Sequence, residues 1–253
     1  MQNTTIGIIA GSGLKSLHPF NEWRYQEVTT RYGIAEVNIG CINEKQIIFL
    51  PRHGINRSAP AHLVNHKANI AAMAEIGVRK ILGVCAVGSL RTDIQPGSAA
   101  VISDFIDFTR RNPATIFDTL EIENKHTDLS RPYCESISLA LFQSASAAGF
   151  EVITPCIYIS VDGPRYETPA EIKLFRSWGA DIVGMTGAPE AIICKEMDIC
   201  YGSIAIVTNY GAGITDDRLT HDEVIEVMNA AKDKISQTLL YALELIPNEC
   251  THK

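Results

Sequence analysis

The sequence predicts an α/β fold in which a central mixed, largely parallel sheet is flanked by helices. Two observations lead to this prediction. Short β-branched runs alternate with longer helical patterns along the chain. Several of the short runs are apolar on both faces, as strands covered by helices on two sides must be. No repeat, linker or low-complexity stretch interrupts the alternation, so we expect one domain spanning residues 1–253.

The individual elements follow from these patterns. The expected strands are Thr5–Ala10, Gln46–Leu50, Lys80–Cys85, Ala99–Ser103, Glu151–Ser160, Asp181–Met185 and Ser203–Thr208. The expected helices are Val64–Ile76, Pro132–Ala148, Pro169–Trp178, Pro189–Met197 and His221–Leu245. Three of the helices begin with proline, which suits a first turn because the missing N–H has no helical partner there.

Composition and charge exclude several classes of protein. Hydrophobic residues make up 46% and charged residues 20% of the chain, which allows a packed core and argues against disorder. The net charge is −7 with Lys and Arg scattered, so we expect no nucleic-acid-binding surface. Neither a signal peptide nor a run of about 18 apolar residues is visible, so we expect no membrane span. The seven cysteines lack a C-x-x-C spacing, which indicates a reduced, cytoplasmic protein without a disulfide framework.

Three loops that follow expected strands carry groups suited to an anion, and in α/β folds function collects in such loops. Gly11-Ser12-Gly13 can present backbone N–H groups and a hydroxyl, although a glycine turn without a ligand explains it equally well. Arg52-His53 offers a forked donor set and a ring nitrogen, and Thr186 offers another hydroxyl. A single arginine at a strand end is more often a surface residue. Three such loops together favour an anion site.

Two further polar features have alternative explanations. Asn209 follows an apolar strand, and its amide can donate and accept at a purine edge; a turn-forming Asn before glycines explains it equally well. His62 and His66 have the i, i+4 spacing of a helical metal pair, but the Glu of H-E-x-x-H and a third ligand are lacking. We therefore expect no metal site. The G-x-S-x-G elbow of an α/β-hydrolase is also lacking.

Five separated motifs are more specific. They are Pro51-Arg52-His53-Gly54; Val64-Asn65-His66-Lys67-Ala68-Asn69-Ile70; Gly88-Ser89-Leu90 with Gln95-Pro96-Gly97; Asp162-Gly163-Pro164-Arg165-Tyr166; and Trp178-Gly179-Ala180-Asp181 with Met185-Thr186 and Pro189-Glu190. Together, and in this order, they resemble the trimeric purine nucleoside phosphorylase and methylthioadenosine phosphorylase family. The resemblance runs from Gly7 to about the helix after His221.

The resemblance implies that inorganic phosphate is a co-substrate and that no cofactor takes part. The implied phosphate-binding residues are Ser12, Arg52, His53, Cys85, Ala86 and Thr186. Arg52 and His53 are also the implied catalytic residues, together with Asn209 at the base. Cys85 is a departure, because methylthioadenosine phosphorylases usually have Thr there. A thiol is a weaker donor, so the backbone N–H of Ala86 would carry more of that contact.

The resemblance also implies a set of nucleoside contacts. The set comprises Ala86, Tyr166, Glu167, Met185, Asn209, Gly211, His221 and His126. Tyr166 takes the place of an aromatic residue that packs on the purine, Met185 lies against the ribose, and Asn209 contacts the six-substituent and N7. His126 resembles a residue that reaches into the neighbouring subunit's site. We therefore expect a homotrimer with shared active sites.

Asn209 and Glu167 bear on the choice of base. Methylthioadenosine phosphorylases resemble one another in having Asp at the position of Asn209 and a second Asp two residues on, where this chain has Gly211. A neutral amide can donate to O6 and accept from a protonated N7, whereas a carboxylate would repel O6. Glu167 can accept from N1–H, or it can instead cap the helix that begins at Pro169. The combination favours a 6-oxopurine nucleoside.

His221 bears on the 5′ end of the substrate. It resembles a histidine that contacts the 5′-hydroxyl in ordinary purine nucleoside phosphorylases; the alternative is a helix N-terminal His beside the N-cap Thr220. The motifs are closer to the methylthioadenosine branch, so 5′-methylthioinosine stays open beside inosine and guanosine. The expected function is phosphorolysis to free purine and (methylthio)ribose-1-phosphate in purine salvage. The alternatives are a methylthioadenosine phosphorylase and a non-catalytic purine-type ligand binder, which only Cys85 suggests.

Overall fold

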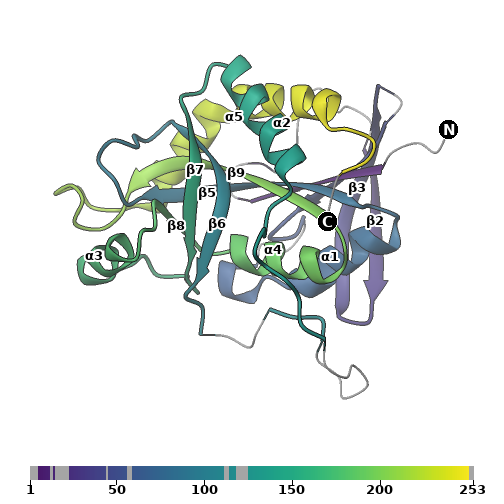
Figure 1. Ribbon diagram of the computed structural model, residues 1–253, viewed down its shortest axis with the longest axis horizontal. Helices are drawn as coiled ribbons and strands as arrows, with labels where there is room; N and C mark the ends of the chain where they lie inside the picture. Colours follow the sequence, from purple (N-terminus) through teal and green to yellow (C-terminus); the bar gives the residue numbers. More distant parts are fainter. Residues whose placement is uncertain are drawn as a thin grey trace.

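The computed structural model describes residues 5–11, 14, 23–43, 45–55, 59–110, 114–117 and 125–250. In that part of the chain, nine strands form one sheet with helices on both sides, which confirms the predicted α/β class (Figure 1). The strands are β1 (Thr5–Ala10), β2 (Arg24–Thr30), β3 (Gly33–Ile42), β4 (Lys45–Pro51), β5 (Lys80–Ser89), β6 (Ala99–Asp107), β7 (Val152–Ser160), β8 (Ile182–Gly184) and β9 (Cys200–Tyr210). The helices are the 3-10 helix η1 (Ala61–Leu63), α1 (His66–Glu75), α2 (Glu135–Ala147), α3 (Pro169–Ser177), α4 (Gly187–Glu196) and α5 (His221–Leu245).

The sheet is mixed, and part of it closes on itself. Its strands are ordered β2-β3-β4-β1-β5-β8-β7-β6-β9, and β5 also pairs with β9. The strands β5, β8, β7, β6 and β9 therefore form a closed ring, from which β1, β4, β3 and β2 extend. β1 runs parallel to β4 and β5, and β9 runs parallel to β5. The carboxyl ends of these four strands consequently meet at one edge, where α/β proteins bind their ligands.

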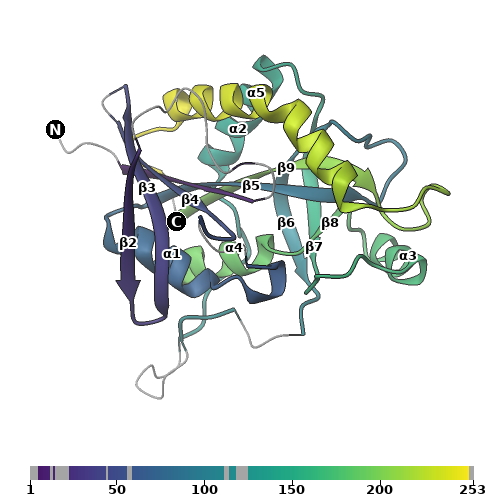
Figure 2. The same ribbon diagram turned by 180° about the vertical axis from the view of Figure 1, so that it is seen from behind.

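The core lies on both faces of the sheet. Helices α2 and α5 cover one face, and α1 and α4 cover the other (Figures 1 and 2). Side chains alternate along β5, because successive residues of a strand point to opposite faces. Leu82 and Val84 pack in the cluster with α2 and α5. Ile81 and Cys85 pack in the cluster with α1 and α4. Among the described helices, none has the combined length and apolar character that crossing a membrane would require.

Three boundaries differ from the expectations in ways that matter for the site. β5 continues through Ser89, so the segment Ala86–Ser89 is strand and not loop. β9 continues through Tyr210, so Asn209 belongs to the sheet. Helix α2 begins at Glu135 with Cys134 as N-cap, after the proline that was expected to start it. The antiparallel hairpin of β2 and β3 is an addition that the expected elements did not include.

Candidate active site

A cavity of about 500 Å³ opens where the carboxyl ends of β1, β4, β5, β8 and β9 meet the first turn of α5. Most of the predicted site residues line it. They are Arg52, His53, Cys85, Ala86, Tyr166, Glu167, Met185, Thr186, Asn209 and His221. The sheet topology thus brings together residues that are spread over 170 positions of the chain, from Arg52 to His221.

Three predicted residues are not part of this lining. Ser12 lies outside the described residues. Gly211 donates its N–H to the carbonyl of Ser89 at 2.7 Å, and a Cβ built on Gly211 would point at the Ile172 side chain. Gly211 is thus outside the lining, and its contact with the substrate stays a prediction. His126 is exposed and outside the lining, so its role at a neighbouring site stays a prediction.

Arg52 is a buried residue whose guanidinium is held in place from two sides. It follows β4 directly, and only 3% of it is exposed. Its Nε and Nη2 donate to the two carboxylate oxygens of Glu190, at 2.5 and 3.0 Å, and its Nη1 donates to the Val84 carbonyl at 2.8 Å. A guanidinium has five N–H groups, so two of them remain for a ligand in the cavity. The surface-residue explanation of Arg52 is wrong.

Gly11 is the residue that lets the guanidinium reach this position. A Cβ at Gly11 would lie 2.6 Å from Arg52 Nη1. Val84 holds that nitrogen and Glu190 holds the other two nitrogens of the guanidinium, so Nη1 has little freedom to move aside. Position 11 therefore requires glycine, because any larger residue would displace the guanidinium of Arg52.

Glu190, the partner of Arg52, was quoted within a motif but not predicted as part of the site. It is 1% exposed on α4 and also accepts from the Tyr201 hydroxyl at 2.8 Å. His66 Nδ1 lies 3.6 Å from its Oε1. Burial by itself would raise the pKa of Glu190, but the Arg52 charge and the contacts with His66 and Arg52 outweigh it and lower the pKa to about 2. A buried arginine needs a carboxylate partner, but no local pattern in the sequence distinguishes Glu190 from the other acidic residues.

His53 offers the cavity an acceptor more readily than a donor. Its Nδ1 lies 2.7 Å from the Ala59 carbonyl, which can only accept, so Nδ1 carries the proton. In the neutral ring Nε2 is then an acceptor, and a Cβ on Gly11 would lie 3.7 Å from it. Burial and the Arg52 charge lower the pKa of His53, which favours the neutral ring. The donor role that the sequence suggested therefore applies only to the imidazolium form.

Thr186 and Cys85 add two short polar side chains. Thr186 is the N-cap residue of α4, and its side chain makes no capping hydrogen bond. The Tyr158 hydroxyl instead accepts from the backbone N–H groups of Thr186 and Gly187, both at 3.1 Å. Burial raises the pKa of the Cys85 thiol to about 11, so the thiol is neutral at pH 7. Both side chains can donate to an anion, the hydroxyl more strongly than the thiol.

A β-bulge turns two consecutive residues of β9 toward the cavity. The register against β5 shifts between Val87, which pairs with Val207, and Gly88, which pairs with Asn209. Thr208 is the extra residue, and both Thr208 and Asn209 line the cavity, which regular alternation would prevent. Asn209 is 5% exposed and lies in a strand, so the turn explanation is wrong.

The amide of Asn209 is oriented by its two chain neighbours. Thr208 Oγ1 donates to Asn209 Oδ1 at 2.9 Å, and Asn209 Nδ2 donates to the Tyr210 carbonyl at 2.9 Å. Each amide atom keeps capacity for a further bond: one lone pair on Oδ1 and one hydrogen on Nδ2. The residue can therefore present one acceptor and one donor side by side.

Glu167 is not the cap of α3, which removes the structural explanation offered for it. The N-cap is Thr168, which accepts from the Glu171 N–H at 3.2 Å while the Glu171 carboxylate accepts from the Thr168 N–H at 2.8 Å. This reciprocal capping box has the sequence signature Thr-x-x-Glu, which was available in residues 168–171. Glu167 is 8% exposed and lines the cavity, and burial raises its pKa.

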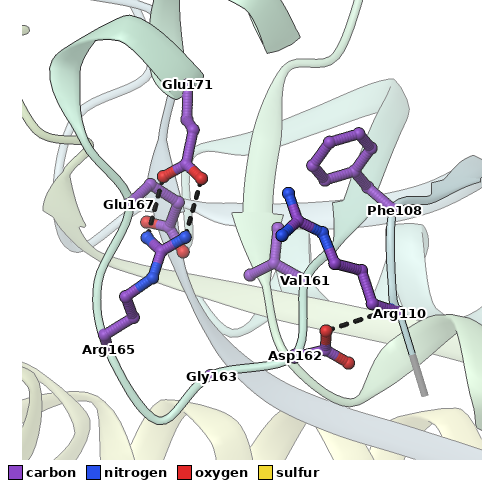
Figure 3. A pocket seen from close by; sticks show the side chains of 8 residues that line it. All are labelled: Phe108, Arg110, Val161, Asp162, Gly163, Arg165, Glu167 and Glu171. Carbon is purple, nitrogen blue, oxygen red and sulfur yellow. Dashed lines mark hydrogen bonds and ion pairs between the residues drawn. The ribbon is translucent and has the colours of Figure 1, made fainter.

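A smaller cavity of about 190 Å³ shares Glu167 with the first one (Figure 3). In it, Arg165 points at Glu171 and forms an ion pair of 2.7 Å with that carboxylate (Figure 3). Arg110 donates its backbone N–H to Asp162 at 2.9 Å. Arg165 is therefore committed to Glu171 and not to Glu167.

Helix α5 supplies the last wall of the cavity. His221 is its first residue, and Thr220 caps the helix by accepting from the Glu223 N–H at 3.3 Å. His221 is therefore both a helix N-terminal residue and a cavity residue, so the two explanations do not exclude each other. Val224 and Ile225, one helical turn on, also line the cavity and were not predicted.

Comparison with known sequences places this site among known proteins. The model of the phosphorylase superfamily matches residues 5–244. A protein of Thermococcus kodakarensis named "probable 6-oxopurine nucleoside phosphorylase" is 42% identical over 249 residues, covering 96% of this chain and 93% of its own. A protein of Methanopyrus kandleri named "probable S-methyl-5′-thioinosine phosphorylase" is 39% identical over 245 residues, with coverage of 96% and 93%.

The fold is likewise shared with a solved structure. Methylthioadenosine phosphorylase from Schistosoma mansoni, in complex with adenine, superposes with a TM-score of 0.88 at 30% identity, covering 98% of this chain and 93% of that one. The matching model and the relatives span nearly the whole chain. The chain therefore belongs to the phosphorylase superfamily, among its nucleoside phosphorylase enzymes.

Proposed function

We propose that this protein phosphorolyses a 6-oxopurine nucleoside to the free base and a ribose-1-phosphate. The observation that carries the proposal is the oriented, neutral amide of Asn209 in the same cavity as the buried pair of Arg52 and Glu190. The amide of Asn209 suits the edge of a 6-oxopurine, and the guanidinium of Arg52 suits an anion. The relatives named above for 6-oxopurine and methylthioinosine substrates support the same choice of base.

Phosphate binds in this proposal against Arg52, His53 and Thr186. The two uncommitted N–H groups of Arg52 face a pair of phosphate oxygens, which is the geometry that guanidinium favours. Neutral His53 accepts the P–OH hydrogen at Nε2, which leaves the charged oxygens for Arg52 and for the Thr186 hydroxyl. The Ala86 N–H and the weaker Cys85 donor, together with Ser12, complete the set that the resemblance implies.

The reaction exchanges one bond at C1′ of the sugar for another. A phosphate oxygen attacks C1′ from the face opposite the base, and the C1′–N9 bond breaks with its electron pair moving onto the purine. The transition state resembles an oxocarbenium ion, so the bound anion stabilises positive charge as well as acting as nucleophile. Met185 borders the sugar and packs against Gly163, whose φ of +67° favours glycine.

The leaving base receives its stabilisation from Asn209. As the electron pair of the broken bond moves onto the ring, N7 takes up a proton from solvent water. The N7–H then donates to Oδ1 while Nδ2 donates to O6, so the amide favours release of the base as its neutral N7–H tautomer. The Tyr210 carbonyl, which can only accept, holds Nδ2 and so leaves Oδ1 to face N7. Glu167, as carboxylate, accepts from N1–H, a donor that only the 6-oxopurine has. Tyr166 stacks on the ring from the same loop.

Phosphorolysis of 5′-methylthioinosine is a second candidate, and the apolar side chains beside His221 favour it. Val224 and Ile225 line the cavity next to His221, which lies at its rim and is exposed. An apolar wall suits a methylthio group, whereas the imidazole suits a 5′-hydroxyl. Both candidates share the 6-oxopurine and differ only at the 5′ end.

We further propose that the chain is one domain that acts in the cytoplasm as a homotrimer, with His126 completing a neighbour's site.

Parallel assays of base release test this proposal. Purified protein is incubated with inosine, 5′-methylthioinosine or 5′-methylthioadenosine, each with and without inorganic phosphate. We expect phosphate-dependent release of hypoxanthine, with a kcat/KM about 10- to 100-fold above that for adenine release, because a mismatched base leaves buried polar groups unpaired. Preference for methylthioadenosine would sink the 6-oxopurine assignment. Release without phosphate, or no release, would indicate a hydrolase or a binder.

A further inference from the structure

Three cysteines from distant parts of the chain meet outside the catalytic cavity. Cys134 is the N-cap residue of α2, Cys200 is the first residue of β9, and Cys250 follows the end of α5. Their Sγ atoms lie within 4.8 Å of one another. None of the three lines the cavity described above. Cys134 and Cys200 are buried at 3% and 7% exposure, and Cys250 is half-buried.

The spacing of these sulfur atoms suits a single metal ion. With Zn–S bonds of about 2.3 Å, sulfurs of a shared ion lie roughly 3.8 to 4.0 Å apart, in tetrahedral or trigonal geometry. Three thiolates select soft or borderline cations over Mg²⁺ and Ca²⁺. In the described part of the chain no fourth Cys, His, Asp or Glu joins the group. A water beside the half-buried Cys250 would take the fourth position.

Rigid backbone holds two of the three thiols in place. The Cys134 N–H donates to the Tyr201 carbonyl at 2.7 Å, and the Cys200 N–H donates to the Arg79 carbonyl at 2.9 Å. Lys80 anchors the segment that brings in Cys250, because its Nζ donates to the carbonyls of Pro247 and Asn248 at 2.6 and 2.7 Å. A site on such elements needs little reorganisation to bind an ion.

The charges at this cluster also suit a divalent ion. Three thiolates and one divalent cation sum to −1, and the buried ammonium of Lys80 beside them brings the group to neutrality. Cysteine binds a metal ion as the thiolate, so binding at this cluster releases the thiol protons.

We propose that Cys134, Cys200 and Cys250 form a binding site for one divalent thiophilic cation of the Zn²⁺ class. The ion would tie the C-terminal segment to the starts of α2 and β9. Binding would stabilise the folded state in proportion to its occupancy, since the three ligands meet only after folding. It would strengthen as the pH rises, because the competing protons are lost.

Cd²⁺ titration of the fully reduced, full-length protein tests this site. One equivalent of Cd²⁺ should produce a sulfur-to-metal charge-transfer band in the ultraviolet, and Zn²⁺ should compete for the same sites. Zn²⁺ should also raise the midpoint of thermal unfolding. The key variant is Cys250→Ser, because this residue lies in the C-terminal segment, where its loss leaves the core intact. We expect Cys250→Ser to weaken Cd²⁺ binding by at least about 100-fold. Loss of a group that only hydrogen-bonds to a metal ligand costs about 10- to 100-fold, and loss of a ligand should cost more.

Two cysteine variants outside the cluster serve as controls. Cys41→Ser removes an exposed thiol and Cys156→Ser removes a buried one, and both should keep the band and the Zn²⁺-dependent stabilisation. Absence of a band at one equivalent in the reduced wild type would overturn the proposal. An unchanged Cd²⁺ affinity in Cys250→Ser would also overturn the proposal. The same holds if the charge-transfer band is lost only in Cys41→Ser.

Discussion

Replacing Glu190 by glutamine tests the claim that a buried ion pair builds the anion site. Both side chains are 1% exposed, so loss of the carboxylate leaves the Arg52 charge buried without a counter-charge. Glutamine keeps the volume, but its single carbonyl can accept from only one of the two Arg52 donors, and its NH₂ group faces the other. Breaking a buried ion pair in this way lowers the free energy of unfolding by about 3–5 kcal/mol, and that free energy is about 5–15 kcal/mol for a typical folded domain.

Urea denaturation and phosphate kinetics measure the two consequences of Glu190→Gln. The free energy of unfolding at pH 7 should fall by the amount above, and the KM for phosphate should rise more than the KM for nucleoside. The pKa of Glu190 is lowered to about 2 from 4.5, so the stabilisation is fully present above pH 4.5 and is lost as the pH falls through about 2. The difference in the free energy of unfolding between wild type and Glu190→Gln should therefore decrease as the pH falls from 4.5 to about 2.

A surface ion pair provides the matched control for Glu190→Gln. Asp93→Asn removes an exposed carboxylate that pairs with the exposed Arg91, and surface pairs are worth about 0–1 kcal/mol. The argument fails if Glu190→Gln costs no more than this control, or if its KM for phosphate equals that of the wild type.

Three further substitutions probe separate parts of the cavity. Gly11→Ala places a methyl group 2.6 Å from Arg52 Nη1, and should raise the KM for phosphate about tenfold or more, the equivalent of one lost hydrogen bond; an unchanged KM would contradict the close packing. Burial raises the pKa of Glu167, so wild-type kcat/KM for inosine should fall as the pH drops through that pKa, whereas Glu167→Gln should lower the value at pH 7 and flatten the acid limb; a variant with an identical pH profile would exclude the role of the carboxylate. His221→Leu should reduce kcat/KM for inosine more than for 5′-methylthioinosine, because only the former loses a hydrogen bond; equal losses would place the 5′ end elsewhere.

The strands and helices that surround the site could be predicted because their patterns are strong. β1, β4, β5 and β9 are apolar on both faces, and α5 has a clear amphipathic pattern and the N-cap Thr220. The hairpin of β2 and β3 lies at the edge of the sheet. Along both strands, buried residues alternate with partly or fully exposed ones, so neither strand contains a continuous buried run. Its period-two pattern was readable, but it is weaker than the continuous apolar runs of the central strands.

Ten of the residues that line the cavity could be predicted, mainly from the family resemblance, but the contacts between them could not. Arg52 and Glu190 are 138 positions apart, and nothing local in the sequence joins them. The bulge that turns Thr208 and Asn209 to the same side depends on the register of β9 against β5, which only the assembled sheet defines. The capping box at Thr168, by contrast, was visible in the sequence and would have resolved the ambiguity of Glu167.

The ratio of kcat/KM for inosine to that for adenosine, in wild type and in Asn209→Asp, tests the central claim most directly. A carboxylate repels O6 and accepts from a 6-amino group, so the ratio should fall by about 10- to 100-fold in the variant. The Tyr210 carbonyl, 2.9 Å from Nδ2, would also lose its donor, so thermal unfolding of both proteins must be compared to separate misfolding from altered choice of base. Asn209→Ala should lower both rates without reversing the preference. A ratio that Asn209→Asp leaves unchanged in a folded protein would contradict the account of how this cavity selects its base.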